Sequence, residues 1–190
     1  CLAEYVEAAP TIKELFEDLP SIKSGGSSHK YRCDVSSQFV EKYIRKKDDI
    51  LTQHAARPHN ENDLKIYKLV LRAKKKGKNL RYIDIPEELQ THSNTTSFLD
   101  RYKALDYGFV SHTVVAHIAK DGHYYIHPDL RQNRSITVRE AARIQGFPDD
   151  FYFEHSRTAA FKQIGNAVPP MLSKKIAMAV IDFLRGEKGE

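Results

Sequence analysis

The chain has little cysteine and no long apolar run. Its 190 residues include only two cysteines, Cys1 and Cys33, and no metal-ligand spacing joins them, which argues against a disulfide scaffold. No apolar stretch approaches the length of a membrane span, and no charged-then-apolar leader is present. We therefore expect a protein that works in a reducing, cytoplasmic setting and has no membrane partner.

The composition is that of a globular protein with a basic balance. Hydrophobic residues make up 41% of the chain and charged residues 29%, and the formal net charge is +5. Two basic runs stand out, one at residues 42–47 and a denser one at residues 74–81. A polyanionic partner is favoured only modestly, because many basic proteins never bind nucleic acid and a charge run is often a solvated face.

Two helices with clear boundaries are predicted near the C-terminus. Thr137 and Glu140 have the spacing of a capping box, and Gly146 with the following proline ends that helix. Residues 163–170 are predicted to form a Gly-bearing turn, in which the two prolines begin a second helix. Its apolar residues repeat with a period near 3.6: Met171, Leu172, Ile176, Ala177, Val180, Ile181 and Leu184.

These two segments carry a specific resemblance. The sequences TVREAARIQGFPDDF (137–151) and KQIGNAVPP (162–170) closely resemble the ninth and tenth signature motifs of the DNA cytosine-C5 methyltransferases, in the same order and at a short separation. In that family the tenth motif lines the S-adenosylmethionine pocket. The resemblance implies cofactor contacts at Asn166, Ala167 and Val168, and structural charges of the ninth motif at Arg134, Arg139 and Glu140.

The predicted turn at Gly165 and Asn166 can be interpreted in two ways. A Gly-Asn turn near a helix start would expose backbone N–H groups and one side-chain amide to a polar ligand. Asn166 could equally be an ordinary turn or cap residue.

One residue between the motifs departs from the family pattern. The family usually has a glycine two residues after a phenylalanine there, whereas this chain has His155 after Phe153. Histidine tolerates a positive φ less readily than glycine.

The motifs that perform the chemistry in this family are not in the chain. Family members attack C6 of a flipped cytosine with the cysteine of a Pro-Cys dipeptide, assisted by the glutamate of a Glu-Asn-Val motif. Here Cys1 precedes Leu2, and Cys33 lies between Arg32 and Asp34. We expect no catalytic residue in this chain and no activity alone. Methyl transfer to C5, as in restriction-modification systems, would need an N-terminal half. The alternative is a catalytically inert DNA-binding or structural remnant.

The remaining sequence is divided by its loops into three expected parts. Residues 1–24 form a linker helix from the catalytic domain, with a capping box at Thr11 and Glu14. Residues 25–133 form the target-recognition region, and residues 134–190 contain both motifs and the last helix. The pattern from residue 35 to 72 is mostly helical, broken by a polar loop. In that loop His54 and Arg57 are candidate contacts to double-stranded DNA, with solvation as the alternative.

A β-hairpin is predicted from residues 112–118 and 123–126, joined by a turn at Gly122. Thr113 matches a family step whose threonine lies near the DNA, although a threonine selected for β-propensity is the alternative. We therefore expect an α+β fold with a small β-bearing recognition region and a C-terminal helix that belongs to a missing catalytic α/β domain. That helix needs cover, from homo-oligomerisation or local packing.

Four histidines on or beside this hairpin raise the alternative of a metal site: His112, His117, His123 and His127. On a strand, residues five apart face opposite sides. Because His112 and His117 would point away from each other, they could not easily share one ion. Structural zinc also usually needs four well-placed ligands. We expect no metal.

Overall fold

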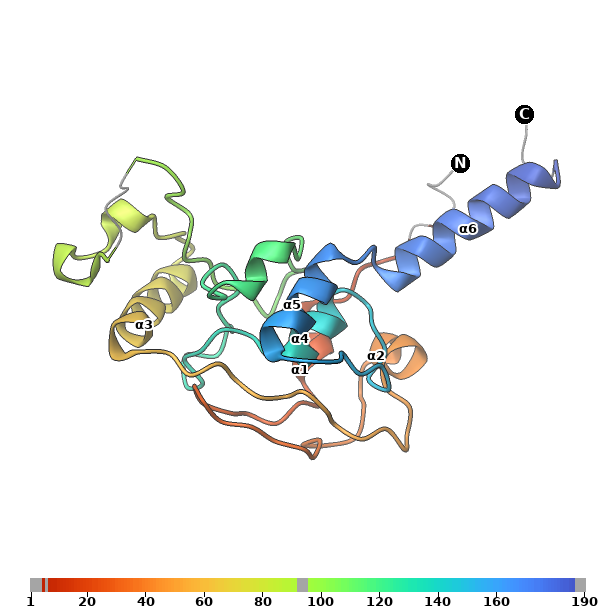
Figure 1. Cartoon of the computed structure of the whole chain (residues 1–190), viewed down its shortest axis with the longest axis horizontal. Coiled ribbons are helices and arrows are strands. Elements are labelled where there is room, and N and C mark those ends of the chain that lie inside the picture. The colour runs from red at the N-terminus through yellow and green to blue at the C-terminus, as the bar shows by residue number, and fades with distance from the viewer. Residues whose placement is uncertain (1–4, 6, 92–95, 187–190) are drawn as a thin grey trace.

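The computed structural model describes residues 5, 7–91 and 96–186, and these form helices joined by long loops. Figure 1 shows α1, α2, α4 and α5 gathered in the middle, with α3 at one end and α6 projecting from the other. None of the helices in these ranges has the length and hydrophobicity to cross a membrane. The elements in chain order are α1 (Ile12–Phe16), α2 (Gln38–Tyr43), α3 (Glu61–Lys75), η2 (Tyr82–Asp84), η3 (Glu87–Leu89), η4 (Ala116–Ala119), α4 (Val138–Ile144), α5 (Arg157–Asn166) and α6 (Pro170–Leu184).

The expected α+β fold with a β-bearing recognition region is wrong. No β-strand occurs within the described ranges, where pairing is limited to isolated bridges: Ser27 with Ala55, Ala104 with Ile126, and Ile126 with Ser135. Instead of a first hairpin strand, residues 116–119 form the 3-10 helix η4. The predicted turn is shifted towards the C-terminus: Gly122 has a φ of +79°, and the Tyr125 N–H donates to the Gly122 carbonyl at 2.9 Å, within the segment expected to be the second strand.

Side chains take the place of the partner strand in this segment. The Tyr125 hydroxyl accepts a hydrogen bond from the Val115 N–H (3.1 Å) and donates one to the Thr113 carbonyl (2.9 Å). His112 Nε2 lies 2.8 Å from the Tyr124 carbonyl oxygen. Because these groups satisfy the extended backbone, it needs no ladder, and tertiary contacts outweigh its β-propensity.

The two predicted capping boxes are confirmed. The Thr11 hydroxyl accepts from the Glu14 N–H, and the Glu14 carboxylate accepts from the Thr11 N–H at 2.8 Å, which fixes the start of α1. Thr137 and Glu140 do the same for α4. Gly146 follows α4 at φ +76°, the left-handed conformation that ends many helices. Local sequence therefore determines where both helices begin.

The predicted Gly-Asn turn is wrong, because Gly165 and Asn166 are the last residues of α5. Ser156 caps that helix by accepting from the Ala159 N–H at 3.2 Å. The chain bends only after Asn166, at Ala167, and α6 then begins at Pro170. The residue before the cap is His155, whose φ of +72° is the conformation that glycine favours.

Two hydrophobic clusters organise the molecule. The larger one draws on α1, α2, α4 and α5, and the part of the chain around it is called the main body. The smaller one lies under α3, and residues 58–104 are called the α3 lobe. Ile126 of the main body completes its core, which also contains Ile66, Tyr67, Val70, Leu71, Tyr82, Ile85, Tyr102 and Ala104.

Helix α6 is joined to neither cluster. None of its residues is buried, although it is more apolar than α3 and α5. It makes polar contacts with the N-terminal segment: the Tyr5 hydroxyl donates a hydrogen bond to the Asp182 carboxylate, and Lys175 forms an ion pair with Glu7 at 3.6 Å. The large side chains it exposes are Leu172, Ile176, Met178, Val180, Ile181, Phe183 and Leu184.

Candidate functional site at the contact between α5 and η4

The C-terminal end of α5 packs directly on the backbone of η4. A Cβ atom on Gly165 would lie 2.6 Å from the Cα and N atoms of Ala116 and 2.6 Å from the carbonyl carbon of Val115. Such distances are far inside van der Waals contact, and the obstacles are backbone atoms. Only glycine therefore allows the helix that leads to Asn166 to lie against the segment that follows Thr113.

Arg57 also contacts both η4 and α5. Its guanidinium donates to the Lys120 carbonyl at 2.6 Å and lies within 3.5 Å of the Ile118 and Ala119 carbonyls, which end η4. It also sits 5.5 Å from the centre of the Phe161 ring of α5. Burial, with the nearby Arg157, lowers the pKa of Arg57. The side chain predicted to contact DNA is thus engaged in joining two elements.

His54 lies in the core. It is 1% exposed, with Nδ1 3.2 Å from the Thr137 hydroxyl and Nε2 2.9 Å from the Pro20 carbonyl. Burial lowers the pKa of this imidazole, which favours the neutral ring. Its contact with Thr137 helps to position the N-cap of α4. Of the three residues predicted to meet DNA, only Thr113 has an exposed side chain.

The residues predicted to contact the cofactor lie at one surface turn. Asn166 is exposed at the end of α5, and Val168 is 59% exposed just before α6. Gln145, which follows α4, donates to the Ile164 carbonyl at 3.1 Å and to the Ala167 carbonyl at 3.3 Å. This side chain therefore ties the turn to the end of the ninth-motif helix.

The ninth-motif charges form a buried pair. Arg134 makes a bidentate contact with Glu140, with both N–O distances 2.7 Å, and also donates to the Ile22 carbonyl at 2.9 Å. Burial alone would raise the pKa of Glu140, but the Arg134 guanidinium outweighs it and holds that pKa far below its usual range. Both groups are charged, and each satisfies the other.

Arg139 serves the loops rather than a single acid. Its guanidinium donates to the Thr52 hydroxyl at 2.7 Å and to the Phe151 carbonyl at 2.9 Å, with a further bond to the Pro148 carbonyl. It lies 3.7 Å from Asp149. This one buried side chain therefore connects the loop before α3 with the loop after α4.

Sequence reasoning missed Arg143. It is fully buried and pairs with Asp18, which follows α1, and with Asp149, and it donates to the Leu15 carbonyl at 2.7 Å. The one signal in the sequence was its position four residues after Arg139, which puts both on neighbouring parts of one helix face. The partner Asp18 lies too far away in sequence to be inferred.

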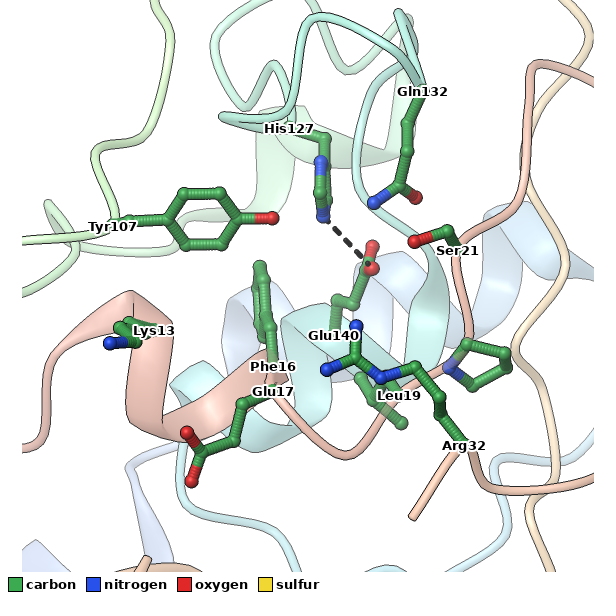
Figure 2. A pocket seen from close by; sticks show the side chains of 11 residues that line it. Lys13, Phe16, Glu17, Leu19, Ser21, Arg32, Tyr107, His127, Gln132 and Glu140 are labelled. Carbon is green, nitrogen blue, oxygen red and sulfur yellow. Dashed lines mark ion pairs between the residues drawn. The ribbon is translucent and has the colours of Figure 1, made fainter. Parts of the chain in front are cut away.

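A cavity of about 220 Å³ borders this network. Figure 2 shows the His127 ring directed at Glu140, with Nε2 3.6 Å from the carboxylate, and Phe16 and Tyr107 nearby. The Phe16 ring stacks on His127 at 5.7 Å. Burial lowers the pKa of His127 to about 3, although Glu140 opposes this shift. Because the His127 ring is neutral and Glu140 is already paired with Arg134, we interpret this side of the cavity as structural and not as a ligand site.

The described residues contain no group of three or more His, Cys, Asp or Glu side chains able to hold a metal ion. The histidines near the failed hairpin contact tyrosines instead. His112 stacks on Tyr125 at 4.8 Å, and His117 meets Tyr124 edge-on at 5.3 Å. These contacts give the rings a packing role.

The chain belongs to the C-5 cytosine-specific DNA methylase family, whose model matches residues 4–182. It is 46% identical over 183 residues to the type II methyltransferase M.Bpa9945I of Bacillus paralicheniformis, covering 93% of this chain. It is 34% identical to DNA (cytosine-5)-methyltransferase 2 of Arabidopsis thaliana over 86% of this chain. It also resembles a solved structure of a prophage-encoded DNA modification methyltransferase from E. coli, with a TM-score of 0.57 and 25% identity over 94% of this chain.

The chain spans less than half the length of these relatives. It covers 41% of the Bacillus protein, 12% of the Arabidopsis protein and 48% of the E. coli structure. Membership of the family is shown by the matched residues.

Proposed function

We propose that this chain is the C-terminal portion of a DNA (cytosine-5)-methyltransferase, where it binds double-stranded DNA and completes the S-adenosylmethionine site. The whole protein transfers the cofactor's methyl group to C5 of a cytosine flipped out of the duplex, since that atom cannot be reached properly inside the stack. The nucleophile belongs to an N-terminal portion. The contact of Gly165 with Val115 and Ala116 carries this proposal, because it joins the predicted cofactor turn to the predicted DNA segment.

The turn at residues 166–168 fits part of an S-adenosylmethionine site. Asn166 offers a solvent-facing amide and Val168 an exposed apolar side chain, which together suit a ligand with polar and apolar parts. Gln145 holds the backbone of the turn in place. The rest of the cofactor site would come from the N-terminal portion.

Helix α6 supports the proposal of a second portion. An exposed apolar face of this kind marks an interaction site in a soluble protein, and seven of the eight large hydrophobic side chains of α6, all but Met171, are exposed. We propose that the catalytic portion covers it. In isolation, pairing of two copies through α6 would cover the same face, and sedimentation at several concentrations separates a monomer from such a dimer.

The test is transfer of tritium from S-adenosylmethionine to DNA. The chain is assayed alone and mixed with the N-terminal portion of the Bacillus relative, and we expect activity only in the mixture. Asn166→Ala should raise the KM for S-adenosylmethionine, whereas Lys162→Ala, another exposed position on α5, should leave it unchanged.

Two results would contradict the proposal. DNA binding without methyl transfer in a mixture shown to form a complex would identify a catalytically inert DNA-binding remnant. An equal KM for both variants would remove Asn166 from the cofactor site and leave it as a helix-end residue.

A further inference from the structure

Nearly all of the excess positive charge of the chain lies in the α3 lobe. Residues 58–104 contain ten Lys and Arg against six Asp and Glu, a formal charge of +4 out of +5 for the whole chain. The rest of the molecule is therefore almost neutral. Such asymmetry concentrates an attractive field for polyanions on one end of the protein.

The lobe has a hollow in which these charges converge. A pocket of about 250 Å³ is lined by Lys74, Lys78 and Lys103, with Asn79 beside them. Asp100 is the one acidic residue in its lining. Three lysines and an asparagine therefore line one small hollow, and side chains of these types are the usual donors to a phosphate group.

The pocket is linked to the segment that contains Thr113. Lys103 Nζ donates to the Tyr124 hydroxyl at 3.4 Å, and that hydroxyl donates to Asp100 at 3.1 Å. The Tyr124 ring packs edge-on against His112 at 4.8 Å. Burial, together with the charges of Lys103 and Lys74, lowers the pKa of His112 to about 4. The basic pocket thus lies close to the residue before Thr113.

We propose that this pocket binds a backbone phosphate of the duplex whose bases the Thr113 segment faces. The inference rests on the DNA binding in the proposed function and names a surface for it. Lys74, Lys78 and Lys103 supply affinity without sequence preference, because phosphates are the same at every step. Thr113 and its neighbours are then left to discriminate bases.

The experiment measures binding of the chain to a short mixed-sequence duplex across a range of salt concentrations. Replacing Lys74, Lys78 and Lys103 together by Gln should make the plot of log K against log salt shallower by about 1, since the pocket binds one phosphate and each phosphate contact contributes about 0.9 to the slope. The matched control replaces Lys23, Lys30 and Lys47, three exposed lysines of the main body, and should keep the original slope. Circular dichroism checks that both fold.

A second variant tests the pocket with the opposite sign. Asp100→Asn removes the one acidic group from the lining but keeps an oxygen for the Tyr124 hydroxyl, so DNA affinity at low salt should rise several-fold. An unchanged slope in the pocket variant, an equal loss in both lysine variants, or no gain for Asp100→Asn would overturn the inference alone. A wild-type chain that binds no duplex at low salt would overturn the DNA-binding part of the proposed function as well.

Discussion

The main body and the α3 lobe use the same types of charged residue in opposite ways. Around α4, three arginines are fully buried, and they meet the acids Glu140 and Asp149 nearby in sequence and the distant Asp18. In the lobe, Lys74, Lys78 and Lys103 surround an open pocket with a single acid in its lining. Basic side chains therefore hold the body together in one region and are available to a ligand in the other.

The difference has a physical cost that can be measured. Removing one partner of a buried ion pair leaves an uncompensated charge and costs about 3 to 5 kcal/mol. Removing a surface charge usually changes stability by no more than about 0.5 kcal/mol. The comparison therefore predicts that stability depends on the body's charges and DNA binding on the lobe's.

The largest effect is expected for Glu140→Gln. The substitution keeps an amide near the capping position but leaves Arg134 buried without its carboxylate, so the free energy of unfolding should fall by about 3 to 5 kcal/mol. Glu88→Gln, at an exposed position of the α3 lobe, is the control and should change it by less than about 0.5 kcal/mol. Urea denaturation measures both. Equal losses in the two variants would break the distinction between body and lobe.

Part of the acid sensitivity should come from a buried histidine of the main body. The folded-state pKa of His127 is lowered to about 3 by burial, so the unfolded chain takes up a proton near pH 6.5 that the folded chain refuses. Stability from this group is present above pH 6.5 and is lost as the pH falls towards the folded pKa. Between pH 7 and pH 5 one such histidine contributes about 2 kcal/mol.

The variant His127→Gln isolates that contribution. Between pH 7 and pH 5 the free energy of unfolding should fall in both proteins. The fall in the variant should be smaller than the fall in the wild type by about 2 kcal/mol. His29→Gln, at an exposed position, should follow the wild-type curve. Parallel curves for all three proteins would show that His127 takes up its proton without unfolding the chain.

The contact between α5 and η4 gives an intermediate effect. A Gly→Ala change inside a helix normally stabilises by about 0.5 to 1 kcal/mol. At Gly165 the new methyl would meet backbone atoms at 2.6 Å, so Gly165→Ala should instead cost about 1 to 3 kcal/mol. Thermal unfolding measures the change. Because the helix must move away from the Thr113 segment, duplex affinity should weaken as well.

Gly108→Ala is the matched control, since its nearest obstacle to a Cβ is the Asp106 side chain at 3.7 Å. It should leave the melting temperature nearly unchanged. If Gly165→Ala were as stable as the wild type, α5 would have room to adjust. The cofactor turn and the DNA segment would then not be rigidly connected.

Local features of the fold could be predicted from the sequence, and long-range ones could not. The capping boxes at Thr11 and Thr137 depend on residues three positions away, and both are present. The hairpin failed because the partners of its first strand are the Tyr125 hydroxyl and the backbone contact of Gly165. Neither contact leaves a periodic signal, so β-propensity alone gave the wrong element.

The candidate site shows the same limit. The sequence correctly placed the start of the last helix at the two prolines, but it treated Gly165 as part of a turn, whereas this glycine lies in α5 and its lack of a side chain allows helix packing. Arg57 looked like a loop cation free to reach DNA. Its partner, the Lys120 carbonyl, lies 63 residues away, and such a partner can be found only in the folded chain.

The smallest effect is expected at His155, in the loop between the two motifs. Its φ of +72° strains a residue with a Cβ, and the relief should exceed the extra backbone entropy of glycine, so His155→Gly should stabilise by about 0.5 to 1 kcal/mol. His29→Gly, at an exposed position whose own φ is not positive, should be neutral or slightly destabilising. Thermal unfolding compares them. Destabilisation by His155→Gly would mean that the imidazole makes a contact worth more than the strain, which would give this departure from the family pattern a function of its own.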